Sequence, residues 1–495
     1  MGFDMKTRGI FSAVIICLLF CLQFCASGEE QYYAVFIDGQ RAGYAVHNRG
    51  VNGNEVRTSD RVMMTINRMG VPITIATNET CIETAKGEPI GFEAMQDMSM
   101  WRTTMTGRVA ADGNVSIVST TGQYEQTKNF QWPAGAVMAE GMLLIQKEKG
   151  LAEGTEYSLK MFSPSLMQAA ETKIRVGPKR DVDLLGKMVT LTEVESVVNM
   201  FTGAVKSVSY VDDEFNTLKT QTAMMGIKLE MVACDKGFAI QETEPTELLG
   251  KTFIKSPKPM KNIKAAKSAR YKIRPTGSAT DFKIPSDDNQ KVKVMQDGSV
   301  LVIVSPAFMP GRTQLGYRGR DKEVLDALKS NRYVQSDDEK IKELAKQAIG
   351  DTRNAAEAVR KIEAFVGNYI EQKDLSVGYA SAAEVAQSKQ GDCTEFAVLT
   401  AAMCRAAGIP ARVVVGVAYV DEFMGNKDVF GGHAWTEVFI GNRWVGLDSA
   451  FRGSGRGGYD AGHIALASGS GELEDYFGLL FNLGQFEIED VKVLR

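Results

Sequence analysis

The chain has 495 residues, a formal net charge of -4 at pH 7 and 24% charged residues. Its length is sufficient for two to four domains with their own hydrophobic cores. The near balance of charge excludes the strong global field of a typical nucleic-acid-binding protein, and 44% hydrophobic residues is the content of an ordinary globular protein. We therefore expect a folded protein without a nucleic-acid partner.

Residues 1–28 have the features of an export signal. Two basic residues, Lys6 and Arg8, precede an apolar run that ends at Phe24, and small residues follow before Glu29. The apolar run is shorter than the about 20 residues that a membrane-spanning helix needs. We therefore expect an exported protein, periplasmic or extracellular, with no stable membrane span after the signal is removed.

Removal of this signal leaves four cysteines: Cys81, Cys234, Cys393 and Cys404. So few cysteines in an exported protein of this size do not make a disulfide scaffold. Cys393 and Cys404 stand eleven residues apart on one predicted helix, so their Cα atoms lie about 16 Å apart, too far for a disulfide. Cys393 is therefore expected to be a thiol unless a distant residue pairs with it. A bridge between Cys81 and Cys234 stays open.

Residues 29–250 are predicted to be a β-rich antiparallel region. Short alternating runs rich in Val, Ile, Thr and aromatic residues are separated by turn signals such as Asp38-Gly39 and Asp112-Gly113. The rhythm of residues 180–250 is similar to that of the earlier part. This similarity leaves open that the region consists of two related β units.

Residues 251–333 are predicted to hold a basic linker and a small β region. The stretch from Lys251 to Pro275 contains nine basic residues, three prolines and no acidic residue, as is typical of a solvated connector between domains. Further along, Asp297-Gly298 is another hairpin signal. Residues 334–495 then form the last predicted domain.

From Ser336 onward the hydrophobic period becomes helical. Ser336 is predicted to cap a helix that Gly350 ends, a second helix is predicted over residues 352–370, and Ser381 with Glu384 predicts the start of a third. Because strands dominate the first part and helices precede strands in the last, the predicted fold class is α+β.

The stretch from Gln390 to Arg412 reads QGDCTEFAVLTAAMCRAAGIPAR and places a cysteine at the start of a buried helix. Asp392 is the predicted N-cap and Glu395 the third helical residue, so the helix begins at Cys393. In a first helical turn, unsatisfied N–H groups and the helix dipole favour a thiolate over a thiol. The backbone amide of Cys393 is also placed to bind an oxyanion. This placement predicts a nucleophile.

A thiolate nucleophile needs a base, and His433 is the histidine placed to supply it. His47 lies in the distant β region and His463 in a glycine-rich tail. His433 opens HAWTEVFIGNRWVGLDSAF, a predicted hairpin with Gly441-Asn442 as its turn. In that register Asp448 is the diagonal neighbour of His433, at about 7 to 8 Å between Cα atoms. An Asp-His hydrogen bond spans this distance.

Each of these residues also has an ordinary structural interpretation, as a core cysteine, a partly buried strand histidine or a capping aspartate. Their coincidence at fitting positions favours a catalytic triad of Cys393, His433 and Asp448. A metal site made of the same three residues is the chemical alternative, but no fourth ligand stands at a recognisable spacing. The sequence therefore predicts catalytic residues and neither a metal ion nor a cofactor.

The stretches GDCTEFAVLTAAMCRAAGIPARVVVGVAY and GGHAWTEVFIGNRWVGLDSAF together resemble the core of the transglutaminase-like superfamily, over roughly residues 334–452. The resemblance implies a papain-like α+β domain, with Cys393 as the nucleophile, His433 as the base and Asp448 as the residue that orients the base. Ser-Ala-Phe follows Asp448 where many relatives have Pro-Thr. The β-rich region before this domain resembles the accessory domains of exported bacterial relatives, without a specific motif.

The resemblance implies acyl transfer from an amide of a protein or peptide substrate through a thioester on Cys393. Water as acceptor gives a protease or amidase, and a lysine gives a cross-linking transglutaminase. Hydrolysis is favoured because nothing resembles the calcium sites or additional barrels of the animal cross-linking enzymes. Cross-linking of protein amines and a non-catalytic binding or scaffolding module with the same fold stay open. A second oxyanion donor is also open, because Gln387 and Gln390 both lie upstream of Cys393.

Overall fold

The structure is a computed structural model, and it describes most of the chain after residue 29. The described ranges are 30–68, 71–98, 101–121, 124–200, 203–224, 227–247, 253–276, 283–373, 380–423, 425–455, 457–471 and 485–494. The predicted export signal, residues 1–28, lies outside the described residues. The chain divides into two compact units, residues 1–248 and 249–495.

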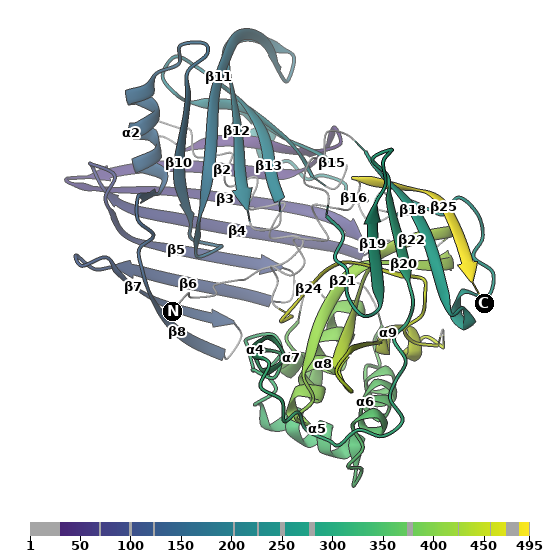
Figure 1. Cartoon of the computed structure of the whole chain (residues 1–495). Helices are drawn as coiled ribbons and strands as arrows, with labels where there is room; N and C mark the ends of the chain where they lie inside the picture. Colours follow the sequence, from purple (N-terminus) through teal and green to yellow (C-terminus); the bar gives the residue numbers. More distant parts are fainter. Residues whose placement is uncertain are drawn as a thin grey trace. The chain divides into compact units, whose positions relative to one another are not determined.

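Unit 1 is a 16-stranded sheet in its described part, with two helices (Figure 1). Its strands run in the order β8 to β1 and then β15 to β9, so that β1 and β15 are neighbours and β16 pairs with β3. The elements are β1 (Gln31–Ile37), β2 (Gln40–Asn52), β3 (Glu55–Arg68), β4 (Val71–Thr84), β5 (Pro89–Met98), β6 (Trp101–Val109), β7 (Asn114–Thr121), β8 (Tyr124–Gln131), β9 (Ala136–Val137), α2 (Ala139–Lys149), β10 (Glu156–Ser163), β11 (Gln168–Leu184), β12 (Lys187–Met200), β13 (Gly203–Val211), β14 (Thr217–Met224), β15 (Ile227–Cys234), α3 (Lys236–Ala239) and β16 (Thr246–Glu247).

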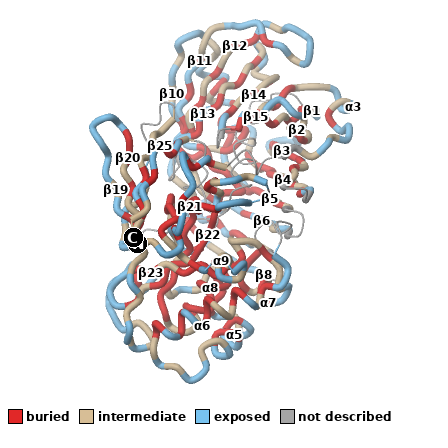
Figure 2. The backbone as a smooth tube through the Cα atoms, turned by 90° about the vertical axis from the view of Figure 1, so that its right-hand side faces the viewer, coloured by how far each residue is buried: buried red, intermediate tan, exposed pale blue. Residues whose placement is uncertain are grey.

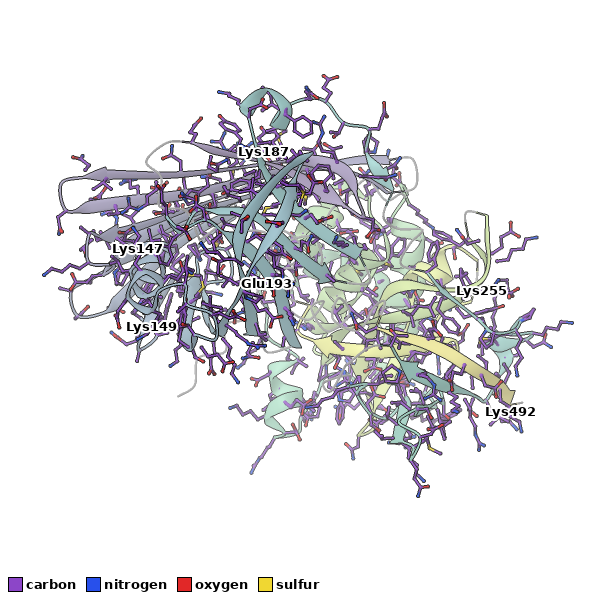
Figure 3. The ribbon with its side chains drawn as sticks, turned by 90° about the horizontal axis from the view of Figure 1, so that it is seen from above. Lys147, Lys149, Lys187, Glu193, Lys255 and Lys492 are labelled. Carbon is purple, nitrogen blue, oxygen red and sulfur yellow. The ribbon has the colours of Figure 1, made fainter. Side chains whose placement is uncertain are left out.

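The sheet of unit 1 curves so that its two halves share a core. In Figure 1 strands β10 to β13 cross in front of β2 and β3. Phe162 of β10 packs against Phe92 of β5, with 5.2 Å between ring centroids. Helix α2 covers part of this core, and its exposed Lys147 and Lys149 project outward (Figure 3), where cations favour a helix C-terminus.

Unit 2 contains two smaller sheets and a group of helices. A five-stranded sheet has the order β17, β22, β21, β24, with β23 also paired to β22, and a four-stranded sheet has the order β19, β20, β18, β25. The elements are β17 (Ile254–Lys255), the 3-10 helix η2 (Ile263–Ala265), β18 (Ser268–Pro275), β19 (Gln290–Val294), β20 (Val300–Val304), α4 (Lys322–Asp326), α5 (Glu339–Ile349), α6 (Ala355–Tyr369), α7 (Ala382–Ser388), α8 (Cys393–Ala406), β21 (Ala411–Phe423), β22 (Asn426–Phe439), β23 (Trp444–Leu447), α9 (Ser449–Gly453), β24 (His463–Gly469) and β25 (Phe486–Leu494).

Helix α8 is the central buried helix of unit 2. It packs on β21 and β22, and α5, α6 and α7 surround it. Figure 2 shows α8, β21 and β22 as largely buried. The hydroxyl of Thr436 on β22 donates to the carbonyl of Ala397 on α8 at 2.9 Å, which fixes the helix against the strand that carries His433.

The predicted α+β class is confirmed, with 51% of the described residues in strands. The predicted turn at Asp38-Gly39 is also confirmed, since it joins β1 to β2 and both residues have positive φ, 47° and 80°. None of the helices in the described part of the chain combines the length and apolar character needed to span a bilayer.

The predicted N-cap of the first long helix in unit 2 is wrong. Asp338, and not Ser336, caps α5, because its carboxylate accepts hydrogen bonds from the amides of Lys340 at 2.8 Å and Ile341 at 3.1 Å. A carboxylate caps as well as a hydroxyl, and Asp338 stands two residues closer to the helix. The helix ends before Gly350, which has φ of 60°, as the sequence predicts.

The next two helices begin at capping residues. Helix α6 starts three residues later than the predicted residue 352, because Asn354 caps it by accepting from the amide of Ala356 at 3.0 Å. Helix α7 has the predicted capping box. The amide of Ser381 donates to the carboxylate of Glu384 at 2.8 Å, and the amide of Glu384 donates back to the hydroxyl of Ser381 at 3.4 Å.

The stretch from Lys251 to Pro275, predicted to be a linker, supplies strands to both sheets of unit 2. Within its described residues, β17 pairs with β22 and β18 lies between β20 and β25. The division between the two units falls between residues 248 and 249. The boundaries at 250 and 333 and the idea of two related β units stay predictions.

Arg405 fastens the turn that joins α8 to β21. Arg405 is only 4% exposed, and its guanidinium is buried among backbone carbonyls. It donates to the carbonyls of Ala411 at 2.9 and 3.0 Å, Lys329 at 2.8 Å and Ser470 at 2.8 Å. Because the planar fork of an arginine can serve several acceptors at once, one side chain holds three segments at the end of the helix that begins with Cys393.

We expect Arg405→Met to lower the free energy of unfolding by about 3 kcal/mol, because it leaves three buried carbonyls without their charged donor. Arg405→Lys should recover less than half of this loss, since an ammonium cannot reach all three carbonyls. Urea unfolding followed by tryptophan fluorescence measures both changes. The matched control is Arg360→Met on the exposed side of α6. A loss for Arg405→Met no larger than the loss for this control would contradict the prediction.

Candidate active site

Cys393 is the first residue of α8, as the sequence predicts. The carboxylate of Asp392 accepts hydrogen bonds from the amide and the hydroxyl of Thr394, both at 2.9 Å, and the amide of Asp392 donates to Glu395 at 2.8 Å. The predicted N-cap is therefore confirmed, and Asp392 and Glu395 together form a capping box. The thiol of Cys393 is half-buried and lies in the turn where the helix dipole favours an anion.

Glu395 ties the beginning of α8 to the segment that precedes α7. It has no exposed surface, and its second carboxylate oxygen accepts a hydrogen bond from the amide of Ala380 at 2.8 Å. Burial raises the pKa of the Glu395 carboxyl well above its usual range, and the nearby charge of Asp392 raises this pKa further. Glu395 therefore fixes the backbone on the N-terminal side of Cys393.

Gly391 gives Glu395 the space that this arrangement needs. A Cβ atom at residue 391 would lie 2.2 Å from Cβ and 2.5 Å from Cγ of Glu395. These atoms are close to the backbone of α8 and cannot move without moving the helix. The glycine before Asp392 is therefore required for the position of Cys393.

His433 and Asp448 are hydrogen-bonded, in the hairpin register that the sequence predicts. Thr436 pairs with Leu447 across the two strands, as a loop of Gly441-Asn442 requires. Nε2 of His433 lies 2.9 Å from Oδ2 of Asp448. Because a carboxylate only accepts, the proton of this hydrogen bond is on Nε2. Nδ1, on the opposite side of the ring, is then the nitrogen that can exchange a proton with a thiol.

Backbone and aromatic contacts hold this pair in place. Asp448 is the N-cap of α9, and its Oδ1 accepts from the amide of Phe451 at 2.9 Å. The amide of Asp448 donates to Glu363 of α6, also at 2.9 Å. The ring of Phe451 stacks on the ring of His433, with centroids 4.5 Å apart. Asp448 and His433 are only 1% and 8% exposed, so solvent does not screen their interaction.

His463, which was expected from the sequence to lie apart from the site, also contacts Asp448. Its Nε2 lies 2.9 Å from the same oxygen, Oδ2, that accepts from His433. His463 begins β24, which pairs with β21, the strand next to β22. The glycine-rich sequence around it carries no strand signal as strong as those of β21 and β22. The available signal in the sequence was that His463 is one of only three histidines in the chain.

The charges around Asp448 explain its ionisation. Burial alone would raise the pKa of its carboxyl, but the charge and hydrogen bond of His433 and the hydrogen bond from His463 outweigh burial and hold this pKa well below its usual range. The ionised carboxylate therefore stabilises the fold above the ordinary aspartate pKa of 3.8. This stabilisation is lost as the pH falls through the lower pKa of the folded state.

The other three cysteines in the described part of the chain, Cys81, Cys234 and Cys404, are not placed for chemistry. Burial raises the pKa of Cys81 and Cys404 above the usual range, and it raises the pKa of Cys234 to about 11. All three are thiols, so the bridge between Cys81 and Cys234 that the sequence left open is not formed in the structure.

His433, Asp448 and His463 also form a group whose ligand atoms lie within 4.8 Å of one another. Both imidazoles donate Nε2–H to one carboxylate oxygen, and a cation could bind only after both rings gave up these protons. The arrangement therefore fits a hydrogen-bonded carboxylate better than a metal ion.

The two glutamines considered as oxyanion donors differ in exposure. Gln387 is on the exposed side of α7, whereas Gln390 is half-buried and forms a bridge with Gln372. By burial, Gln390 is therefore the better candidate of the two for an oxyanion donor. The amide of Cys393 lies in the first turn of α8, where backbone amides can donate to an oxyanion.

Comparisons with known proteins identify the family of the domain that holds these residues. Residues 342–449 match the family model of the transglutaminase-like superfamily, so this part of the chain is a transglutaminase-like domain, as the sequence predicts. We found no match among curated proteins.

Three solved structures have low similarity to the chain. A candidate cysteine protease from Cytophaga hutchinsonii is 19% identical, with a TM-score of 0.30, over 46% of this chain and 86% of that one. A β-barrel-like protein of unknown function from Brucella abortus is 12% identical, with a TM-score of 0.33, over 42% and 95%. A candidate protease from Parabacteroides distasonis is 11% identical, with a TM-score of 0.18, over 70% and 63%.

We expect Gly391→Ala to lower the free energy of unfolding by about 2 kcal/mol, because the added methyl overlaps Glu395 and breaks the capping box at Asp392. Urea unfolding measures this change, and labelling of Cys393 with iodoacetamide at pH 6 should slow as well. Gly311→Ala is the matched control, since a Cβ atom there meets nothing within 4 Å. Equal stability of the two variants would show that Gly391 is not required.

Proposed function

We propose that this chain is an exported cysteine hydrolase or acyltransferase that acts on peptide or glutamine-type amide bonds through a thioester on Cys393. The observation that supports this most is the hydrogen bond of 2.9 Å between His433 and Asp448. It belongs to a transglutaminase-like domain whose central helix begins with Cys393. Proteases and transglutaminases share this arrangement of thiol, imidazole and carboxylate.

In the first half of the reaction, the sulfur of Cys393 attacks the carbonyl carbon of the substrate amide. The proton that the thiol gave up is held on Nδ1 of His433, and the imidazolium is stabilised by Asp448. The amide of Cys393 donates to the developing oxyanion. When the C–N bond breaks, His433 transfers its proton to the departing amine, and the acyl group stays on sulfur as a thioester.

In the second half, neutral His433 removes a proton from the acceptor as it attacks the thioester carbon. The C–S bond breaks, and the thiolate of Cys393 recovers its imidazolium partner. Water as acceptor gives a carboxylic acid, whereas a primary amine gives a new amide. Asp448 stays ionised in both halves, which its low pKa permits.

The first prediction from this proposal concerns the thiol itself and needs no substrate. Cys393 should react with iodoacetamide at pH 6 at least ten times faster than in His433→Gln, because the variant lacks the imidazole that takes the thiol proton. In the variant, the rate should rise only near the ordinary thiol pKa of about 8.5. Peptide mapping assigns the label, and Cys393→Ala gives the background from Cys234. A wild-type rate that follows an ordinary thiol titration would contradict the proposal.

The second prediction concerns the reaction. Incubation with a peptide library should release new α-amines or ammonia with the wild-type chain and none with Cys393→Ala. Asp448→Asn should be slower by about a hundredfold or more, because the carboxylate charge that supports the imidazolium is lost. An added primary amine tests the acceptor, since its incorporation in preference to hydrolysis would identify a cross-linking enzyme. No product under any of these conditions would favour a non-catalytic module.

A further inference from the structure

Asp448 accepts hydrogen bonds from two imidazoles, and the proposed triad uses only one of them. Nε2 of His433 and Nε2 of His463 each lie 2.9 Å from Oδ2 of Asp448. His463 has no exposed surface. Its other nitrogen, Nδ1, lies near three atoms of Asp460, at 3.1 Å from the carbonyl oxygen, 3.2 Å from Oδ1 and 3.3 Å from the backbone nitrogen. The residues therefore form a chain from Asp460 through His463 and Asp448 to His433.

The sheet brings the two histidines to one face of β21. His433 pairs with Gly416 and His463 pairs with Ala418, two residues along the same strand, so both side chains leave the sheet on the same side. A Cβ atom at Gly416 would lie 2.0 Å from the carbonyl oxygen of Ile464. The missing side chain lets the strands approach, and the two imidazole centroids lie 5.7 Å apart.

Aromatic rings pack around the imidazole of His463, whose Nε2 is hydrogen-bonded to Asp448. The ring centroids of Tyr459, Phe451 and Trp435 lie 4.8, 5.1 and 5.2 Å from that of His463. These rings exclude water from the hydrogen bond to Asp448. In such an environment a charge-assisted hydrogen bond is stronger than in water.

The charges that face His463 come from several elements. Asp448 and Asp460 contact it directly. Glu363 of α6 accepts a hydrogen bond from the amide of Asp448, and its other carboxylate oxygen lies 3.3 Å from Nη1 of Arg452. The neutral hydroxyl of Tyr271 on β18 binds the carbonyl of Ala461. Burial alone would lower the pKa of His463, but its hydrogen bonds to Asp448 and Asp460 and their charges raise it to about 9. At neutral pH His463 is therefore a cation between two carboxylates.

We propose that His463 is a positioning residue of this active site, which holds the carboxylate of Asp448 in the orientation that His433 requires and is itself held by Asp460. This inference rests on the function proposed above. With Oδ1 bound by the amide of Phe451 and Oδ2 bound by His463, the carboxylate of Asp448 cannot rotate about its Cβ–Cγ bond. His433 then meets a fixed acceptor, and its ring is held with Nδ1 on the side opposite Asp448.

The test compares two substitutions by the rate of Cys393 alkylation with iodoacetamide at pH 6 in the full chain. His463→Phe fills the aromatic cage but has no donor, so the rate should fall about tenfold. His463→Gln keeps an N–H donor near the place of Nε2 and should stay within about threefold of the wild type. Rescue by glutamine is a result that a purely space-filling role would not give, because phenylalanine is the closer match in shape and polarity to the cage.

The outcomes separate this inference from the proposed function. A wild-type chain that lacks fast alkylation at pH 6, with His433→Gln equal to it, overturns the proposed function and the role of His463 together. A fast wild-type chain with His463→Phe equally fast overturns the role of His463 alone. The same holds if His463→Gln is as slow as His463→Phe. Far-ultraviolet circular dichroism and urea unfolding establish whether both variants are folded. If His463→Phe is not folded, the alkylation rate of His463→Gln is the deciding measurement, and a rate as slow as that of His433→Gln overturns the role of His463.

Discussion

The buried carboxylate of Asp448 is the interaction on which the site depends. A carboxylate taken out of water keeps its charge only where donors replace the water. Here His433, His463 and the amide of Phe451 supply three donors to two oxygens. These donors come from β22, β24 and the first turn of α9, elements that meet only in the folded domain. In the proposed function this carboxylate orients His433, which serves as the base for Cys393.

The frame around these residues is built from short, specific contacts. The capping box of Asp392 and Glu395 sets where α8 begins, and Arg405 holds the other end of the same helix to the turn that enters β21. Thr436 links the helix to β22. This bond holds the strand that carries His433 against the helix that begins with Cys393. Catalytic groups need this kind of support to keep productive geometry.

Local sequence signals predicted the parts of this arrangement that depend on neighbours in the chain. Asp392 and Glu395 predicted the start of α8, and Gly441-Asn442 predicted the register that joins His433 to Asp448, because caps and two-residue turns are read within a few residues. His463 was missed because its place depends on the pairing of β24 with β21, some 45 residues earlier. Ser336 was preferred to Asp338 for a different, local reason, because two good capping residues stood close together.

The most direct test of the account is nuclear magnetic resonance of the chain labelled with ¹⁵N in its three histidines. The account predicts that His433 and His463 both carry a proton on Nε2 at neutral pH, and that Asp448→Asn shifts both of these signals. His47, whose Nδ1 lies 2.7 Å from Asp60, gives a reference for the opposite ring nitrogen. An Nε2 without a proton in His433, or a His463 signal indifferent to the substitution, would contradict the shared carboxylate.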